Sequence, residues 1–215
     1  MTVSVQYTVY NFQARGRAEV IRTIFEYAGV KYENKYPVDW KAEKESAPFG
    51  QLPVLIIKDT TTGKEETIAQ TQAIVRYLAT LFGLTPSDPI LAAKVDMVGE
   101  SLDEYAQTVL GWYFQPPAGE EAKQAAKVQI VNETVPAFIK YQNKLLAANG
   151  NNGYYFGTET TLADIGLFAL VTNWNTKIPE AFDREQMPEL YKVCDRVAKI
   201  PRIAEYLESP RLHAK

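Results

Sequence analysis

Three short segments in the first 80 residues could together bind a small peptide that carries two carboxylates. Trp40 and Lys44 stand four residues apart, so a helix there would place an indole N–H and an ammonium group on one face. The Leu52-Pro53 step is a candidate cis bond, which would leave the backbone of Leu52 open to pair with an extended peptide. Thr71 can cap a following helix, whose positive end favours a carboxylate. Together the segments predict backbone pairing in the middle of the ligand and a carboxylate clamp at each end.

Each of these signals has a simpler interpretation when it is taken alone. Lys44 can be a solvated surface charge, Pro53 can merely begin a strand, and Thr71 can be an ordinary helix cap. Only their combination favours a binding site.

The elements that must position these groups alternate between strands and helices. The run from Val3 to Tyr10 is rich in Val, Tyr and Thr, which indicates a strand. Apolar residues recur at helical spacing between Arg15 and Ala28, and Gly29 is a natural stop. Similar patterns predict strands at 31–38, 53–57 and 66–69 and a helix at 70–82. The opening order of strand, helix and strand predicts a parallel strand pair.

After residue 83 the pattern becomes helical throughout. Two prolines between residues 84 and 90 indicate a linker. Helical periodicity then marks 90–110, 119–149 with a bend near Pro136, 162–174, 188–200 and 201–208. We therefore expect an α/β domain at residues 1–83, a linker at 84–90 and an all-α domain at 91–215.

Composition excludes several classes of protein. Among 215 residues, 23 Lys and Arg oppose 26 Asp and Glu, so the net charge of -3 gives no general attraction to nucleic acid or an anionic membrane. One His and one Cys cannot build a tetrahedral zinc site, and one Cys cannot form a disulfide framework. The N-terminal residues do not resemble a signal peptide, and there is no apolar run of about 18 residues. We expect a cytoplasmic protein without a metal or a membrane partner.

Five sequence blocks follow one another in the order found in one enzyme family. The blocks are Arg15-Gly16-Arg17-Ala18-Glu19, Asp39-Trp40 with Lys44, Pro48-Phe49-Gly50-Gln51-Leu52-Pro53, Gln70-Thr71-Gln72-Ala73-Ile74-Val75-Arg76-Tyr77-Leu78 and Thr161-Leu162-Ala163-Asp164-Ile165. In the last block, Thr161 and Asp164 have the spacing of a capping box. On these blocks the chain resembles the cytosolic glutathione S-transferases of the tyrosine type, most closely the sigma class. Each block is weak alone, and the ordered set is specific.

The resemblance implies a thioredoxin-like N-terminal domain that binds glutathione as co-substrate, and a helical C-terminal domain that walls the pocket for a small hydrophobic electrophile. It implies no prosthetic group and favours a homodimer. The implied glutathione-binding residues are Trp40, Lys44, Gln51, Leu52, Pro53, Gln70, Thr71 and Glu100. The implied acceptor-pocket residues are Phe12, Tyr105, Trp112 and Leu212. Core packing between helices explains Trp112 nearly as well as a pocket role does. A position on a solvated helix face explains Glu100 equally well.

The catalytic group implied by the resemblance is a tyrosine whose hydroxyl stabilises the glutathione thiolate, assisted by Arg17. The family position, four residues before the Arg-Gly pair, is Asn11 in this chain, and Tyr10 lies one residue earlier. Side chains alternate along a strand, so Tyr10 and Tyr7 point to opposite faces, and only one of these faces can meet the ligand at the end of the strand. On this argument Tyr10 is assigned as catalytic. Tyr7 is the reserve. If Asn11 occupies the position, its amide N–H can still donate a hydrogen bond.

Three other functions are known for proteins of this general kind. A thiol transferase or dehydroascorbate reductase of the same fold needs a Cys at the start of the first helix, whereas the single Cys194 lies late in the chain. A non-catalytic scaffold, structural protein or ligand carrier would keep the core blocks and lose activity through the loop that follows Tyr10. Sigma-like relatives also include prostaglandin isomerases, and the sequence does not select the natural electrophile.

Overall fold

The computed structural model describes residues 5–175 and 177–212, and these form two compact units. The first unit contains residues 5–85 together with 200–212, and the second contains the described residues between 86 and 199. The division between Thr85 and Pro86 falls inside the segment predicted as a linker. The first two residues of the predicted opening strand lie outside the described residues.

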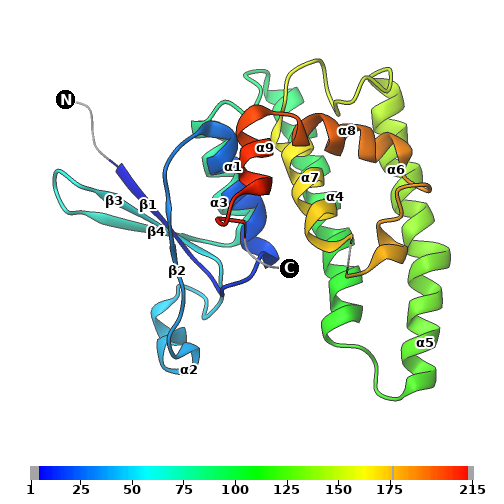
Figure 1. Cartoon of the computed structure of the whole chain (residues 1–215), viewed down its shortest axis with the longest axis horizontal. Coiled ribbons are helices and arrows are strands. Elements are labelled where there is room, and N and C mark those ends of the chain that lie inside the picture. Colours follow the sequence, from blue (N-terminus) through cyan, green and yellow to red (C-terminus); the bar gives the residue numbers. More distant parts are fainter. Residues whose placement is uncertain (1–4, 176, 213–215) are drawn as a thin grey trace. The chain divides into compact units, whose positions relative to one another are not determined.

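A four-stranded mixed sheet forms the centre of the first unit (Figure 1). Its strands are β1 (Val5–Tyr10), β2 (Glu33–Lys35), β3 (Val54–Asp59) and β4 (Glu65–Ala69), in the order β2-β1-β3-β4. β1 runs parallel to β2, as predicted, and antiparallel to β3, which pairs antiparallel with β4. β2 is shorter than the predicted 31–38. One reason is Pro37, which has no N–H to extend the ladder.

Two helices cover one face of this sheet and a short helical segment lies against the other. α1 (Glu19–Ala28) follows the 3₁₀ turn η1 (Gly16–Ala18) and packs against α3 (Thr71–Leu81). α2 (Trp40–Glu43), which is followed by the 3₁₀ turn η2 (Lys44–Ser46), contributes Trp40 to the opposite face. Gly29 ends α1 with a φ of 67°, and a Cβ there would lie 1.7 Å from Nη1 of Arg202, so both conformation and space require glycine.

The last helix, α9 (Pro201–Glu208), belongs to the first unit, whereas the sequence pattern grouped it with the helical domain. The Tyr206 hydroxyl donates to Glu19 Oε1 at 2.9 Å, and Arg202 Nη1 donates to the carbonyl of Ala28 at 2.6 Å. Both acceptors are in α1. Contacts across more than 170 residues of sequence leave no local periodic signal, so the pattern could not show where α9 packs.

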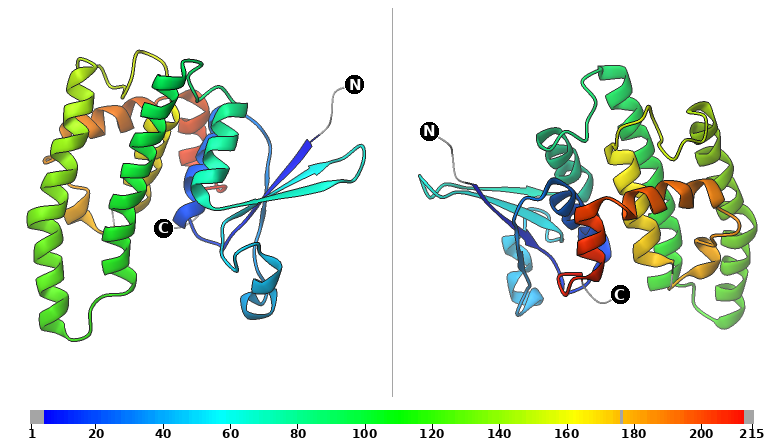
Figure 2. Two further views of the ribbon diagram at one scale, coloured as in Figure 1. Left: turned by 180° about the vertical axis from the view of Figure 1, so that it is seen from behind. Right: turned by 45° about the horizontal axis from the view of Figure 1, so that its top comes forward.

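The second unit is helical in all its described elements (Figure 2). In chain order they are α4 (Pro89–Phe114), α5 (Glu120–Gln129), the π-helical segment η3 (Ile130–Thr134), α6 (Val135–Ala148), α7 (Leu162–Trp174), the 3₁₀ turn η4 (Pro179–Ala181) and α8 (Pro188–Ala198). α7 packs between α4 and α8. The mixed sheet of the first unit and the helices of the second confirm the predicted fold class. None of the described helices is long and apolar enough to cross a membrane.

The bend predicted near Pro136 appears as the π-helical segment η3. Proline lacks the N–H that would bond the carbonyl four residues earlier, so the regular ladder is interrupted there. The N–H of Val135 instead donates to the carbonyl of Ile130, five residues back. This one-turn widening joins α5 and α6.

A capping box begins α7, as the Thr161 and Asp164 spacing predicted. The Asp164 carboxylate is fully buried and accepts hydrogen bonds from the Thr161 N–H at 2.8 Å and the Tyr155 N–H at 3.0 Å. It therefore holds both the start of α7 and the preceding loop. Arg196 Nη2, from α8, lies 3.4 Å from the same carboxylate.

We predict that Asp164→Ala lowers the free energy of unfolding by about 3 kcal/mol, because buried N–H groups lose their acceptor. Urea unfolding followed by circular dichroism measures the change. Thr161→Ser keeps the hydroxyl and serves as the control, with an expected loss of about 1 kcal/mol from the removal of a buried methyl group. Equal midpoints for Asp164→Ala and the native protein would contradict the structural role of this carboxylate.

Candidate functional site

Side chains alternate across the sheet along β1, and this separates the two candidate tyrosines. Tyr7 faces the helices, with its ring 5.1 Å from that of Phe25 and 6.3 Å from that of Phe82. Tyr10 faces the other side, where Trp40 packs against it with a ring separation of 6.4 Å. The predicted opposition of the two tyrosines is confirmed. Tyr7 is buried among these rings, and burial raises its pKa to about 12.

The Tyr10 hydroxyl donates a short hydrogen bond, 2.5 Å, to Oε2 of Glu43 at the end of α2. Burial raises the pKa of Tyr10 to about 12, and the Glu43 carboxylate adds to the rise. Lys35 Nζ lies 4.7 Å from the centre of the Tyr10 ring. The catalytic role of Tyr10 stays a prediction. In this arrangement the Tyr10 hydroxyl donates its proton to Glu43, so the hydroxyl must first leave Glu43 before it can stabilise a thiolate.

Glu43 is a residue of this region that the sequence analysis missed. Its Oε1 accepts the N–H groups of Val38 at 2.8 Å and Asp39 at 2.9 Å, while Oε2 accepts Tyr10. The hydrogen bond from Tyr10, followed by the two backbone N–H groups, lowers the pKa of Glu43. An acidic residue shortly after the N-cap Asp39 was the available signal, but its bond to Tyr10 spans 33 residues and has no local pattern.

α2 carries the predicted clamp for one carboxylate. Asp39 caps the helix by accepting the N–H groups of Lys41 and Ala42, so Trp40 and Lys44 are helically spaced as predicted. The Lys44 stem passes over Gly50, where a Cβ would stand 3.1 Å from Lys44 Cε. Trp40 is half-buried and Lys44 is exposed, so both donors can reach a ligand from solvent.

The middle of the predicted site lies just before β3, and the end opposite α2 lies just after β4. The Leu52-Pro53 bond is cis, one of the two possibilities that the sequence left open, and it leads into β3. Leu52 packs beside Tyr10 and Trp40, while Gln51 is exposed. Gln70 has a φ of 71°, in the left-handed region that few non-glycine residues occupy, and Thr71 begins α3. Such backbone strain is typical of functional positions.

The loop between β1 and α1 is held by Arg22, which is fully buried. Its Nη1 donates to the carbonyls of Ala14 at 3.0 Å and Arg15 at 3.3 Å, and pairs with Glu19 Oε2 at 3.1 Å. The exposed Arg17 lies in η1 just beyond these carbonyls.

Asn11 continues the β1 ladder by donating its N–H to the Lys35 carbonyl at 3.0 Å. Its side chain is therefore expected on the Tyr7 face, opposite Tyr10. The Asn11 amide is buried and donates one hydrogen bond to the Phe12 carbonyl at 3.2 Å.

The residues expected around the acceptor have different surroundings within their own units. In the first unit, Phe12 is 46% exposed, with its ring 5.6 Å from Trp40, and Leu212 lines a surface cavity of about 1110 Å³ beside α1 and β2.

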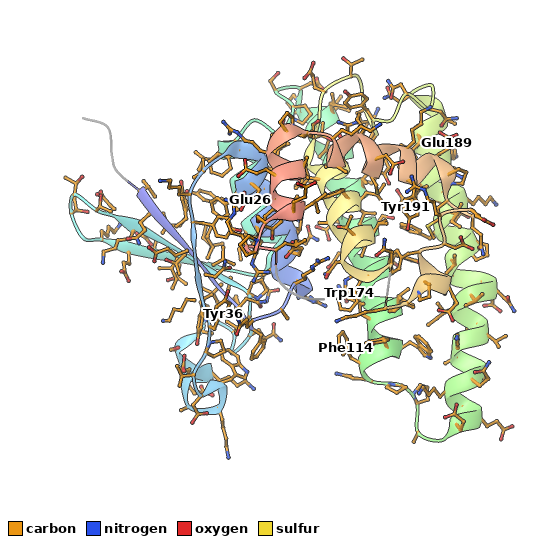
Figure 3. All side chains as sticks on the ribbon, in the orientation of Figure 1. Glu26, Tyr36, Phe114, Trp174, Glu189 and Tyr191 are labelled. Atoms are coloured by element: carbon orange, nitrogen blue, oxygen red, sulfur yellow. The ribbon has the colours of Figure 1, made fainter. Side chains whose placement is uncertain are left out.

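In the second unit, Tyr105 is buried, stacks on Phe138 at 3.8 Å and donates to the Ala181 carbonyl at 2.6 Å, so packing explains it. Trp112 Nε1 donates to the Lys123 carbonyl at 3.3 Å. Near the end of the same helix, the exposed Phe114 lies 5.6 Å from Trp174 (Figure 3).

Two further residues that the sequence analysis considered are Glu100 and Cys194. Glu100 lies on the exposed side of α4. Cys194 is buried in α8, and burial raises the pKa of its thiol, so it is unsuited to act as a nucleophile. Among the described residues, no group of three or more His, Cys, Asp or Glu side chains could hold a metal ion.

Comparison with known proteins agrees with this architecture. Residues 5–80 match the family described as Glutathione S-transferase, N-terminal domain, and residues 104–210 match Glutathione S-transferase, C-terminal domain. Glutathione S-transferase 1 of Ascaris suum is 33% identical over 212 residues, which cover 96% of this chain and 98% of that protein. S-crystallin SL11 of Nototodarus sloanii is 32% identical over 94% of this chain and 95% of its own length.

A solved structure extends the agreement. The sigma class GST of Fasciola hepatica is 26% identical, with a TM-score of 0.84 over 98% of each chain. Fold and sequence blocks thus define a thioredoxin-like domain joined in one chain to an all-helical domain. The chain belongs to the glutathione S-transferase family, which confirms the resemblance found in the sequence.

We predict that Arg22→Lys destabilises the first unit by about 2 kcal/mol, because a lysine cannot bond Asn34, Glu19 and two carbonyls at once. Urea unfolding measures the loss, and hydrogen exchange should rise at residues 14–16. Arg184→Lys, at an exposed ion pair with Asp195, is the matched control and should lose less than about 1 kcal/mol. Indistinguishable losses for the two variants would show that the buried fork has no special role.

Proposed function

We propose that this protein is a glutathione transferase that joins the thiol sulfur of glutathione to small hydrophobic electrophiles. The observation that carries the proposal is the arrangement of α2, the cis Leu52-Pro53 step and the start of α3 in one unit of a chain from this family. α2 and the start of α3 each supply groups that attract a carboxylate. The cis Leu52-Pro53 step supplies backbone groups that can pair with a peptide. Glutathione has two carboxylate-bearing ends and a peptide backbone, so its chemistry matches this set.

The proposed binding roles follow the order of the elements. Trp40 and Lys44 hold the glycyl carboxylate, and the backbone of Leu52, with Gln51 beside it and Pro53 after it, pairs with the middle of the tripeptide. The γ-glutamyl end lies at the start of α3, where Gln70 and Thr71 supply polar groups and the helix N-terminus supplies positive potential. Glu100 is proposed to reach the γ-glutamyl amine of a ligand bound in a partner subunit.

Catalysis requires the bound thiol to ionise. A thiol with a pKa near ~8.5 is only about 3% thiolate at pH 7, so a donor or a positive charge must favour the anion. We assign this to the Tyr10 hydroxyl, which exchanges its acceptor Glu43 for the thiol sulfur when glutathione binds, and to the positive charge of the Arg17 guanidinium. The thiolate then attacks the electrophilic carbon, a carbon–sulfur bond forms, and the leaving group departs with the electron pair.

The remaining features are proposed from exposed apolar surface and from composition. Phe12 offers an exposed aromatic ring for a hydrophobic electrophile, which is in keeping with a role in detoxification. Phe49, Tyr77 and Leu81 are exposed apolar side chains of the first unit, and they favour a homodimer. The single buried cysteine fits a reducing, cytoplasmic compartment.

A second candidate function is a non-catalytic glutathione-binding protein. Two observations favour it: the Tyr10 hydroxyl is committed to Glu43, and one full-length relative is named an S-crystallin. This candidate keeps the glutathione-binding groups and lacks the thiol-activating step.

We predict that Lys44→Met raises the KM for glutathione about tenfold with little change in kcat, because a charge-assisted contact to the glycyl carboxylate is lost. The assay is conjugation of glutathione to 1-chloro-2,4-dinitrobenzene. Lys41→Met, an exposed lysine of the same helix, is the matched control and should leave KM unchanged.

The same assay separates the two candidates. Retention of the native protein on immobilised glutathione without turnover would favour the non-catalytic function. Failure of both retention and turnover would contradict glutathione binding altogether.

A further inference from the structure

We propose that the Glu43 carboxylate is a competing acceptor that holds the Tyr10 hydroxyl in the resting protein and thereby sets how readily bound glutathione ionises. The inference rests on the proposed function and deepens it. Glu43 acts through Tyr10, so it is a positioning residue, and Tyr10 keeps its catalytic role. It follows that the native protein ionises glutathione less readily than Tyr10 would without this competitor.

The first argument is that Glu43 occupies the donor that the thiol needs. A phenol has one O–H group, and that of Tyr10 donates to Glu43 Oε2 at 2.5 Å. Hydrogen bonds to ionised acceptors are stronger than those to neutral ones, so the carboxylate is a better acceptor than a neutral thiol. We therefore expect the hydroxyl to leave Glu43 only for the thiolate, which couples the exchange of acceptors to ionisation of the sulfur.

The second argument is that the exchange needs little movement. Tyr10 is only 4% exposed, and its ring lies 6.4 Å from the ring of Trp40 and 4.7 Å from Lys35 Nζ. These contacts hold the ring in place, whereas a phenolic O–H can rotate about its C–O bond. Glu43 is half-buried at the end of a four-residue helix, so its side chain has room to withdraw.

The third argument is that Glu43 stays satisfied after Tyr10 leaves. Its Oε1 keeps the N–H groups of Val38 at 2.8 Å and Asp39 at 2.9 Å. The hydrogen bond from Tyr10 lowers the pKa of Glu43 most, and the two backbone N–H groups and the positive charge of Lys35 on β2 lower it as well. The carboxylate therefore remains ionised from about pH 6 to 9, where thiols titrate, and it competes for the hydroxyl throughout that range.

Glu43→Gln tests the competition and spares the entry to α2. The new amide oxygen can accept the N–H groups of Val38 and Asp39, and the amide NH2 then faces the Tyr10 oxygen, where it donates instead of accepting. The Tyr10 proton is left for the sulfur. The pKa of bound glutathione, followed by the ultraviolet absorbance of the thiolate, should be about one unit lower. Below that pKa, kcat for 1-chloro-2,4-dinitrobenzene should rise about threefold, because a less basic thiolate is also less nucleophilic.

A double variant shows whether Glu43 acts through Tyr10 or directly on the sulfur. Tyr10→Phe removes the catalytic hydroxyl, so it should raise the thiol pKa and lower kcat. In that background, Glu43→Gln should change the thiol pKa by less than about 0.3, because the competition no longer exists. An equal fall in the thiol pKa with and without the Tyr10 hydroxyl would assign the effect to the charge of Glu43 itself and would overturn the proposal.

Glu45→Gln is the matched control, because it removes an exposed carboxylate from the adjacent turn η2. It should match the native protein in thiol pKa and kcat, and an equal shift in this variant would contradict the competition. If the native protein neither binds immobilised glutathione nor conjugates it, the proposed function fails. If the native protein does both and Glu43→Gln leaves the thiol pKa unmoved, only the competition fails.

Discussion

Alternation of side chains along β1 is the constraint on which the rest of the site depends. One face of the strand packs Tyr7 and Val9 into the core beneath the helices, and the other presents Tyr10 to α2. One side chain cannot lie on both faces of the strand. Tyr10 therefore contacts α2, and Tyr7 packs against the helices. The next position, Asn11, is still in the ladder through its N–H and falls on the helix face.

Polar contacts of two side chains convert this constraint into a fixed site. Glu43 connects α2 to the sheet, and Arg22 connects the loop before η1 to α1. Both are single side chains with several hydrogen bonds, and both restrain segments too short to hold themselves. Around the fully buried Arg22 the dielectric is low, so its hydrogen bonds are stronger than in water and an unpaired group there is correspondingly unfavourable. The glutathione-binding elements are therefore placed by polar contacts as much as by apolar packing.

Features that depend on neighbouring residues could be predicted from the sequence. Features that depend on contacts between distant residues could not. Helical periodicity placed α7 at its observed bounds, and proline chemistry marked Leu52-Pro53 as a candidate for the cis bond that the structure contains. The capping box at Thr161 needed only a spacing of three residues. By contrast, Glu43 and Arg22 act on partners that the chain brings close only after folding, and a charged residue in a sequence does not reveal whether it will be buried. For the same reason the sequence could not show that the Tyr10 proton has an acceptor.

The most direct test is an experimental structure of the protein with bound glutathione. The account predicts that the Tyr10 hydroxyl leaves Glu43 and that its oxygen lies within about 3.3 Å of the thiol sulfur, while Trp40 and Lys44 contact the glycyl carboxylate. A Tyr10 hydroxyl that stays bonded to Glu43 and points away from the sulfur would contradict the account.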